Sequence, residues 1–534
     1  MATDVHLEAA VEDPAQSQWL NFLPNLQGQR VLVAGKCPAD VIRALRARSG
    51  MPVTSIGEEN AVLGCELMSL PVRPPVSDKF SFAVIDGIAG VSEFDLAIDQ
   101  VIPIFQSDVG KMVVCLAAGW SKLRLRRYAR SKVRDLGFAS AAYYCDPDVD
   151  KPERIISLCA GAGPALSILC PRPDSVFARV KWAFKAMFYR VAGCLNPRFG
   201  LVLIAQKEVN AVNQGSMAQL ATELVNLSAK EATVVSVSQH YNGRQFLFVY
   251  DSSAKSKLRA VAKFANRRYP RFALSKREYR ALSLADSVSS RMPMDSRFAP
   301  TVLFSECSSE STAIVLSAAD GQSIAQLCSS REMSRNSELA GQVLAKGVRL
   351  LRRIQKEISL DPASIDFRCD HRYLENYLQL PILMSPKVDE DVQHGDFTVE
   401  HVFFDPAKNR WTVLDWEWLG RGYPFLMDVF SFLRSVRFLQ PRNQGAHWKD
   451  VSFLSLQDTF FRENWFSELS RAIVSEYIAA RGLSHLDRYS CFLQYLLFRC
   501  NKVRLDEVFW PHQLRDWERL TEFAVTNRNQ FQLW

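Results

Sequence analysis

The sequence predicts two units of different fold class, an N-terminal α/β unit and a C-terminal α+β unit. Over residues 28–207, apolar runs of strand length alternate with helix-length segments, which is the pattern of a doubly wound parallel sheet. Over 208–534, strand-rich sequence comes first and helical sequence follows, which predicts a small lobe and a larger helical lobe. A chain of 534 residues is long enough for both units. Residues 1–27 fit neither pattern and are expected to be an N-terminal extension.

Four strand-sized runs define the N-terminal sheet: 30–35, 52–57, 82–87 and 111–117. The first run ends at Gly35, and helical spacing follows it from Cys37 to Arg48. A late helix near 133–138 and a closing strand over 200–205 complete the unit. Because segments long enough for a helix separate the strands, we expect parallel pairing with helices on both faces.

The C-terminal unit opens with strands over 233–238, 245–251 and 259–264. Asn242-Gly243, between the first two, is a strong signal for a hairpin turn. These strands belong to a small lobe of about 215–320. The helical lobe, about 321–534, contains a long amphipathic helix over 338–358 and further helices from 425 onward.

The composition narrows the classes of partner and compartment. The formal net charge of +8 permits an anionic partner without requiring one. No apolar run approaches the roughly 18 residues of a membrane-spanning helix, and the first residues do not resemble a secretory signal. The 12 cysteines include no CxxC pair, so we expect reduced thiols and a cytoplasmic protein. No nucleic-acid-binding motif is present, so nucleic acid is not an expected partner.

Two acidic residues on short loops are the strongest candidates for a catalytic site. Asp396 lies in His394-Gly395-Asp396, and Asp415 follows the strand-like run 412–414. A second strand-like run, 402–404, lies between the two loops. Phosphoryl transfer uses two such carboxylates, one to orient the attacking hydroxyl and one to hold Mg²⁺ against the nucleotide phosphates. Mg²⁺ prefers oxygen ligands and often takes only one or two carboxylates from the protein.

A basic residue and an acidic residue upstream strengthen this interpretation. Lys263 lies on the predicted strand 259–264, and Glu278 lies fifteen residues later in a predicted helix. A strand lysine that contacts the phosphates, held by a glutamate on a helix, is the ion pair of kinases.

The segments HGDFTVEHVFF (394–404) and VLDWEWLGRGYPFLMDVFSFL (413–433) resemble the aminoglycoside phosphotransferase and choline kinase family. The resemblance covers about 215–534 and implies a protein-kinase-like fold, with ATP and Mg²⁺ as cofactors and a small molecule, sugar or glycan as acceptor. It implies Asp396 as the catalytic base, Asp415 as a metal ligand, and Lys263 with Glu278 as the phosphate-binding pair. It also implies a structural role for Asp428.

His401 departs from the family pattern. The family has Asn five residues after the catalytic aspartate, and this chain has His401 there. An amide oxygen suits Mg²⁺, whereas imidazole suits zinc, copper or nickel better. His401 is therefore assigned to the metal site as a replacement ligand. The alternative function is a pseudokinase joined to a pseudo-methyltransferase, acting as a scaffold or regulatory binding protein.

The N-terminal unit resembles class I S-adenosylmethionine-dependent methyltransferases over about 28–207, through the runs 82–87, 102–105, 111–116, 133–138 and 200–205. A cofactor loop after the first strand needs several glycines, and only Gly35 is present. Glu58, the candidate for the ribose hydroxyls, lies one position late. We therefore expect a degenerate domain that does not bind S-adenosylmethionine. An active methyltransferase fused to a kinase and a different doubly wound domain stay as alternatives.

Two basic stretches could contact anionic surfaces. Residues 122–134 hold seven basic residues and no acid before Asp135. Residues 176–191 combine an apolar arc with flanking basic residues, a pattern of helices that lie in a membrane interface. The first stretch is more simply a solvated helix, and the second a helix packed on its own domain. Peripheral membrane contact through 176–191 is therefore an open prediction.

Overall fold

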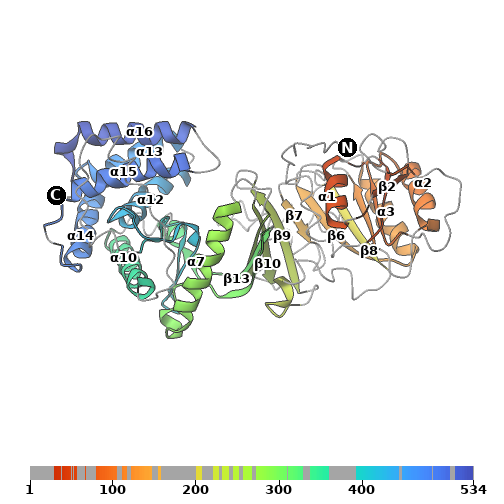
Figure 1. Ribbon diagram of the computed structural model, residues 1–534, viewed down its shortest axis with the longest axis horizontal. Helices are drawn as coiled ribbons and strands as arrows, with labels where there is room; N and C mark the ends of the chain where they lie inside the picture. The colour runs from red at the N-terminus through yellow and green to blue at the C-terminus, as the bar shows by residue number, and fades with distance from the viewer. Residues whose placement is uncertain are drawn as a thin grey trace, which may run out of the picture. The chain divides into compact units, whose positions relative to one another are not determined.

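The computed structural model describes residues 29–35, 37, 39–49, 51, 53–56, 66–67, 80–104, 111–116, 122–146, 154–157, 200–206, 221–227, 231–239, 244–251, 257–266, 272–309, 311–328, 337–359, 392–443, 448–483, 485–505 and 511–532. The chain divides into two compact units, Met1–Tyr269 and Pro270–Trp534 (Figure 1). Glu58, the turn at 242–243 and the segment 176–191 lie outside the described residues, so the predictions made for them stay predictions.

One mixed sheet forms the N-terminal unit, with its strands in the order β3-β2-β1-β4-β5-β8-β6-β7-β9-β10-β11. The first seven strands in chain order are β1 (Val31–Gly35), β2 (Val53–Ile56), β3 (Glu66–Leu67), β4 (Phe82–Asp86), β5 (Lys111–Leu116), β6 (Ala139–Asp146) and β7 (Arg154–Ser157). The remaining four are β8 (Gly200–Gln206), β9 (Ala232–Gln239), β10 (Arg244–Asp251) and β11 (Leu258–Asn266).

The parallel part of this sheet is the doubly wound core that the sequence predicts. β1 pairs in parallel with β2 and β4, β2 with β3, and β4 with β5. The strand order therefore reverses at β1, as in dinucleotide-binding folds. The prediction of a wholly parallel sheet is too simple, because β8 lies antiparallel between β5 and β6.

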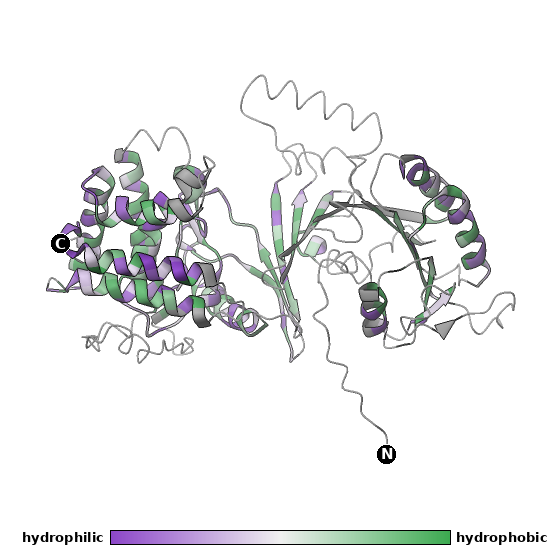
Figure 2. Ribbon diagram, turned by 90° about the horizontal axis from the view of Figure 1, so that it is seen from above, coloured by the Kyte–Doolittle hydropathy of each residue, from purple (hydrophilic) through white to green (hydrophobic). Residues whose placement is uncertain are grey.

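Three helices cover the two faces of the doubly wound core. They are α1 (Ala39–Ser49), α2 (Val91–Val101) and α3 (Leu123–Asp135). α1 lies on one face, and α2 and α3 lie together on the other (Figure 2). In α3 the apolar residues Leu125, Ala129 and Val133 are buried, while Arg124, Arg127 and Arg134 are exposed. The basic stretch 122–134 is thus an amphipathic helix whose apolar face packs on the sheet.

The sheet continues without interruption past residue 207, where the sequence pattern changes. β9 pairs antiparallel with β7, from Arg154 opposite Val237 to Ile156 opposite Val235. β10 then pairs with β9, and β11 with β10. β9, β10 and β11, the three strands expected in the small lobe, fall within the compact unit Met1–Tyr269, and their assignment to a kinase-like small lobe stays a prediction. The boundary between the units falls at Tyr269, beyond the pattern change.

The C-terminal unit begins with helix α7 (Phe272–Ser290) and the antiparallel pair β12 (Val302–Cys307) and β13 (Ser311–Ser317). A three-stranded antiparallel sheet follows, in the order β14-β15-β16, from β14 (Gln322–Ser323), β15 (Val402–Asp405) and β16 (Arg410–Val413). β15 and β16 are the strand pair predicted between Asp396 and Asp415.

Helices make up most of the rest of this unit. They are α8 (Ile324–Cys328), α10 (Ser337–Ser359), α12 (Met427–Asn443), α13 (Trp448–Phe460), α14 (Trp465–Ala479), α15 (Arg488–Leu505) and α16 (Pro511–Thr526). One core joins them, with Leu351, Phe430 and Phe492 among its fully buried residues. α10 is the long helix that the sequence predicts over 338–358, and its apolar residues face this core.

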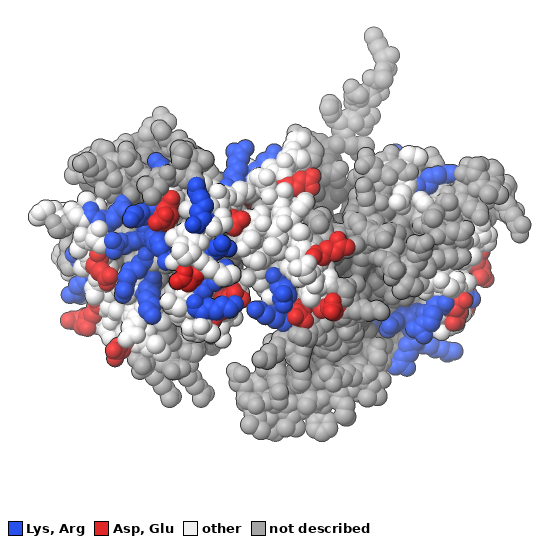
Figure 3. Space-filling model, turned by 90° about the horizontal axis from the view of Figure 1, so that it is seen from below, with Lys and Arg blue, Asp and Glu red and all other residues white. Residues whose placement is uncertain are grey.

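Two further features of the described residues concern membrane spanning and surface charge. Within the described residues, no helix is both long enough and apolar enough to span a bilayer. Lys and Arg side chains gather on one face of the C-terminal unit (Figure 3). Asp and Glu side chains lie among them, so this face is basic without giving the unit as a whole a positive charge.

Candidate active site

A buried carboxylate fixes the loop that carries Asp396. Asp428, in the first turn of α12, is fully buried and accepts hydrogen bonds from the backbone N–H groups of His394, at 2.6 Å, and Gly395, at 3.0 Å. Burial raises the pKa of Asp428 to about 7, against the opposing effect of these hydrogen bonds. Asp428 thus has the structural role that the family resemblance implies, because it ties the loop to a helix of the core.

Gly395 allows the loop to pass close to the Asp415 segment. Its φ is +82°, and a Cβ added there would lie 2.5 Å from the carbonyl oxygen of Trp418. A residue with a side chain would meet both unfavourable backbone torsion and a clash with backbone. The adjacent Gln393 forms a two-way backbone bridge with Gly420, so the two loops are also joined by hydrogen bonds.

His394 is a buried neutral strut beneath the site. Its Nε2 lies 3.1 Å from the carbonyl oxygen of Leu414, and its ring packs edge-on against Trp416 at 4.8 Å between centroids. Burial, followed by the nearby His401, lowers the pKa of His394 to about 4. The ring is therefore uncharged at neutral pH, and its Nε2–H group donates a hydrogen bond to the carbonyl oxygen of Leu414. This hydrogen bond links the loops of Asp396 and Asp415.

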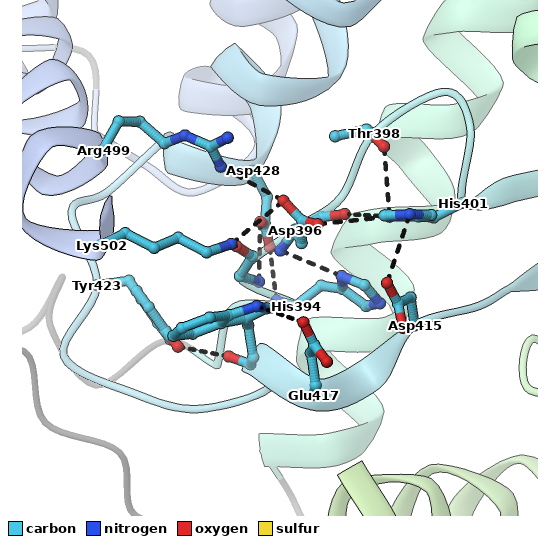
Figure 4. Close-up of polar contacts among 12 residues, drawn as sticks. His394, Asp396, Thr398, His401, Asp415, Glu417, Tyr423, Asp428, Arg499 and Lys502 are labelled. Carbon is cyan, nitrogen blue, oxygen red and sulfur yellow. Dashed lines mark hydrogen bonds and ion pairs between the residues drawn. The ribbon is translucent and has the colours of Figure 1, made fainter. Parts of the chain in front are cut away.

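Asp396 lies between two cations and an imidazole (Figure 4). Its Oδ1 is 3.3 Å from Nη1 of Arg499 and 3.3 Å from Nζ of Lys502, both on α15. Lys502 also donates to the carbonyl oxygen of Gly395 at 3.2 Å and lies over the Trp418 ring. Burial alone would raise the pKa of Asp396, but Lys502, His401 and Arg499 hold it well below its usual range. Asp396 is therefore ionised throughout the physiological pH range.

His401 lies between Asp396 and Asp415, the two acidic residues that the sequence predicts for the site. Its Nδ1 lies 2.9 Å from the carbonyl oxygen of Asp396, and its Nε2 lies 3.5 Å from Oδ2 of Asp415. Because a carbonyl only accepts hydrogen bonds, Nδ1 carries the proton, and Nε2 faces Asp415. Burial lowers the pKa of His401, but Asp415 and Asp396 outweigh it and raise the pKa above its ordinary value. Ligand atoms of Asp396, His401 and Asp415 all lie within 4.8 Å of one another.

Asp415 follows β16 in a backbone conformation that few residues with a side chain adopt. Its φ is 65° and its ψ 62°, in the left-handed region, and it precedes the short 3₁₀ helix η8 (Trp416–Trp418). Strained positions of this kind persist only where the surrounding structure holds them and are common at functional sites. The backbone bond from Leu414 N–H to the His401 carbonyl at 2.8 Å fixes the start of this turn.

A second acidic cluster shares Asp415 with the first. Carboxylate oxygens of Glu278, Asp415 and Glu417 lie within 4.8 Å of one another. Glu278 is buried on α7, and Glu417 accepts a hydrogen bond from the Trp418 indole at 2.9 Å. The neighbouring Arg277 joins α7 to this loop through the carbonyl oxygen of Leu419 at 3.2 Å. The set is all oxygen, the donor chemistry that Mg²⁺ prefers.

The structure brings together four of the five residues that the sequence singles out. Asp396, His401, Asp415 and Glu278 contribute to two clusters that meet at Asp415. Lys263 is on β11 in the N-terminal unit, opposite Phe246 of β10, with its ammonium 5.8 Å from the Phe246 ring centroid. Its pairing with Glu278 stays a prediction.

Sequence reasoning missed Glu417, Arg499 and Lys502. Glu417 stands in the motif Asp415-Trp416-Glu417, where a second acid two residues after the first was the available signal. Arg499 and Lys502 lie about a hundred residues after Asp396 and carry no local signal, since a pair of basic residues on a helix is ordinary.

Comparisons with known proteins find likeness in structure alone. No family model and no curated protein matches the sequence. An aminoglycoside phosphotransferase from Streptomyces rimosus matches at 16% identity and a TM-score of 0.29, covering 52% of this chain and 92% of its own.

Two further solved structures match over different extents. A glucosamine kinase matches at 13% identity and a TM-score of 0.31, covering 58% of this chain and 84% of its own. The bifunctional kinase-methyltransferase WbdD matches at 12% identity and a TM-score of 0.23, covering 88% of this chain and 92% of its own. Likeness at this level carries no argument about chemistry, so the assignments below rest on the geometry.

Proposed function

We propose that this protein is a phosphotransferase that moves the γ-phosphoryl group of ATP to a hydroxyl of a small molecule, sugar or glycan. The observation that carries the proposal is the meeting of the Asp396 and Asp415 loops, with ligand atoms of Asp396, His401 and Asp415 within 4.8 Å. Asp428, Gly395 and the bridge between Gln393 and Gly420 hold these loops in place. Positioning of this kind is most of what phosphoryl transfer requires from a protein.

Asp396 would orient the acceptor hydroxyl and accept its hydrogen bond. Lys502, His401 and Arg499 hold its pKa low, which makes it a weak base. A weak base is adequate because the transition state of phosphoryl transfer is loose and needs little early removal of the hydroxyl proton. Its role is therefore mainly to align the hydroxyl with the phosphorus.

The donor set around Asp415 fits a magnesium ion. Glu278, Asp415 and Glu417 supply oxygen ligands, and His401 offers a nitrogen on the other side of Asp415. When bound, Mg²⁺ neutralises charge on the β- and γ-phosphates. Lys263, which the family resemblance pairs with Glu278, would contact the same phosphates.

The competing function is a binding or scaffold protein that has lost transfer activity. Two observations favour it: His401 occupies the position of an amide ligand, and Arg499 and Lys502 neutralise Asp396. The expected loss of S-adenosylmethionine binding in the N-terminal unit would extend the same interpretation. Calorimetry with S-adenosylmethionine tests whether this binding is lost. Measurable binding would instead support the remaining alternative, an active methyltransferase fused to a kinase.

Calorimetry of ATP binding, with and without Mg²⁺, tests the proposed function. We expect magnesium-dependent binding to the wild type and its loss in Asp415→Ala. Asp458→Ala is the matched control, since Asp458 is a carboxylate on α13 paired with Arg462 away from the site. Absence of ATP binding by a folded wild type would contradict the proposal and favour the scaffold function.

A further inference from the structure

A cavity of about 280 Å³ opens beside Asp396 within the C-terminal unit. Side chains from the Asp396 loop and from α12, α13, α15 and α16 line it. The lining residues used below are Asp396, Ser431, Arg434, Arg499, Asp516 and Trp517. Because Asp396 is on its wall, a molecule in this cavity would present its hydroxyl to the candidate catalytic carboxylate.

Two guanidinium groups form part of the wall and are held against one aromatic ring. Arg434 is 8% exposed and donates from Nη2 to the hydroxyl of Ser452 at 2.7 Å. The guanidinium carbons of Arg434 and Arg499 lie 4.4 and 5.0 Å from the Trp517 ring centroid. Stacking and hydrogen bonding fix both planar groups, and a fixed guanidinium is well suited to bind carboxylate or phosphate oxygens.

Two cations lie against Asp396 at one end of the cavity, and Glu400 and Asp516 are further carboxylates on its wall. Arg499 and Lys502 both pair with Oδ1 of Asp396. Among the described residues, Asp396 is the only carboxylate within 4 Å of either cation. Asp396 is thus shared between two cations, so the guanidinium group of Arg499 keeps the capacity to bind an oxyanion that enters the cavity.

Other atoms of the wall suit hydroxyl groups. The hydroxyl of Ser431, a residue only 5% exposed, and Oδ2 of Asp516 are buried and make no hydrogen bond with any described residue. Buried polar atoms are normally paired, so these two atoms mark places where a ligand or water would bind. A serine hydroxyl and a carboxylate oxygen both accept hydrogen bonds from the hydroxyls of a polyol.

We propose that the acceptor of this site is an anionic polyol, such as a sugar phosphate or a sugar acid. Arg499 and Arg434 bind its oxyanion, and Ser431 and Asp516 bind its hydroxyls. The assignment as an acceptor rests on the proposed phosphotransferase function, whereas binding of the anionic polyol does not. A neutral sugar would offer no oxyanion to the two guanidinium groups, and an amino sugar would bring a further cation beside them.

Calorimetry on the full chain without nucleotide tests the preference directly. The probes are glucose 6-phosphate and glucuronate, compared with glucose, glucosamine and inorganic phosphate. We expect at least one anionic sugar to bind about tenfold or more tightly than glucose, the effect of one charge-assisted hydrogen bond. Tighter or equal binding of glucose or glucosamine would overturn the proposal. Inorganic phosphate binding as tightly as glucose 6-phosphate would overturn the polyol part.

Substitutions test whether a preference for anionic sugars comes from this cavity. Arg499→Gln should remove it and Arg499→Lys should restore part of it, while Arg462→Gln, an exposed arginine of the same unit, should leave it unchanged. Equal preference in Arg499→Gln and the wild type would overturn the assignment. Near-ultraviolet circular dichroism confirms that each variant is folded, and Ser431→Ala serves as a second probe if Arg499→Gln is not.

A transfer assay with labelled ATP separates the two proposals. Anionic sugars that bind but receive no phosphate would contradict the phosphotransferase function and leave the binding site standing. Transfer to neutral sugars alone would support the function and overturn the anionic acceptor.

Discussion

The two sides of His401 differ in the sign of the charges that surround them. On one side Asp396 is paired with Arg499 and Lys502, so that cations exceed anions. On the other side, carboxylate oxygens of Asp415, Glu278 and Glu417 lie within 4.8 Å of one another. In the proposed function, a metal ion would neutralise the second side and an anionic acceptor would bind on the first. The difference indicates that one short stretch of chain separates a place for Mg²⁺ from a place for a negatively charged group.

Removing the charge of Asp396 is the strongest test of this division. We expect Asp396→Asn to lower the transfer rate by about 10²- to 10⁴-fold, the usual contribution of a positioned catalytic base. ATP binding should change little, because the nucleotide side of the site keeps its acids. Transfer rates and calorimetry measured on the same preparation check both statements. A variant that transfers at the wild-type rate would remove Asp396 from the mechanism.

The pH dependence of stability tests His394, the strut that joins the two sides. The pKa of its buried ring falls from 6.5 to about 4 in the folded protein, so between these values the unfolded state binds more protons. Stability due to His394 is therefore complete above pH 6.5 and is lost as the pH falls toward 4. The wild type should lose about 1.4 kcal/mol per pH unit relative to His394→Gln in this window.

Urea unfolding of both proteins from pH 7 to pH 4 measures this difference. Groups that do not interact with His394 titrate alike in the two proteins, so the difference between the two curves reports on this ring and its neighbours. Parallel stability curves would show that folding does not lower the pKa of His394, and its role as a neutral strut would then be wrong.

Glu417 tests the acidic side. Glu417→Gln keeps the oxygen that accepts from the Trp418 indole but removes the negative charge. We expect the affinity for Mg²⁺ in the presence of ATP to fall about tenfold, in the range seen when groups around a metal are changed. Glu476→Gln, on α14 and half exposed beside Arg349, is the control. Unchanged Mg²⁺ affinity would leave Asp415 with His401 as the metal site.

His401→Asn gives the smallest expected effect. The substitution replaces a nitrogen ligand with the amide oxygen of the family pattern, which Mg²⁺ prefers. The ratio of activity with Mn²⁺ to activity with Mg²⁺ should fall a few-fold from wild type to variant. A ratio that does not move would show that His401 does not contact the metal and acts only through its bonds to Asp396 and Asp415.

Local sequence patterns predict most of the helices and strands and the order of the motifs. They do not predict the charges that surround Asp396 in the folded protein. Strands β1, β4 and β5 and the β15–β16 pair follow from short apolar runs, because strand formation is read from neighbouring residues. Arg499 and Lys502 reach Asp396 only because α15 packs against α12 in the folded core. No periodicity encodes such a contact.

Sheet pairing between distant segments escapes sequence reasoning for the same reason. The pairing of β7 with β9 joins residues about eighty positions apart across the change in sequence pattern near 207. Lys263 illustrates the effect, since its strand is predicted from local residues while the continuation of that sheet from β9 to β7 is not.

That pairing determines where the gene can be divided. A protein cut at residue 207 would leave β7 with an open edge in one half and β9 with an open edge in the other. Exposed edges offer unpaired N–H and C=O groups to other chains and promote aggregation. Separate expression of the two halves should therefore give insoluble protein when the chain is divided at this point. The two halves would then have to stay in one polypeptide in order to be soluble, whether or not the N-terminal half is catalytically active.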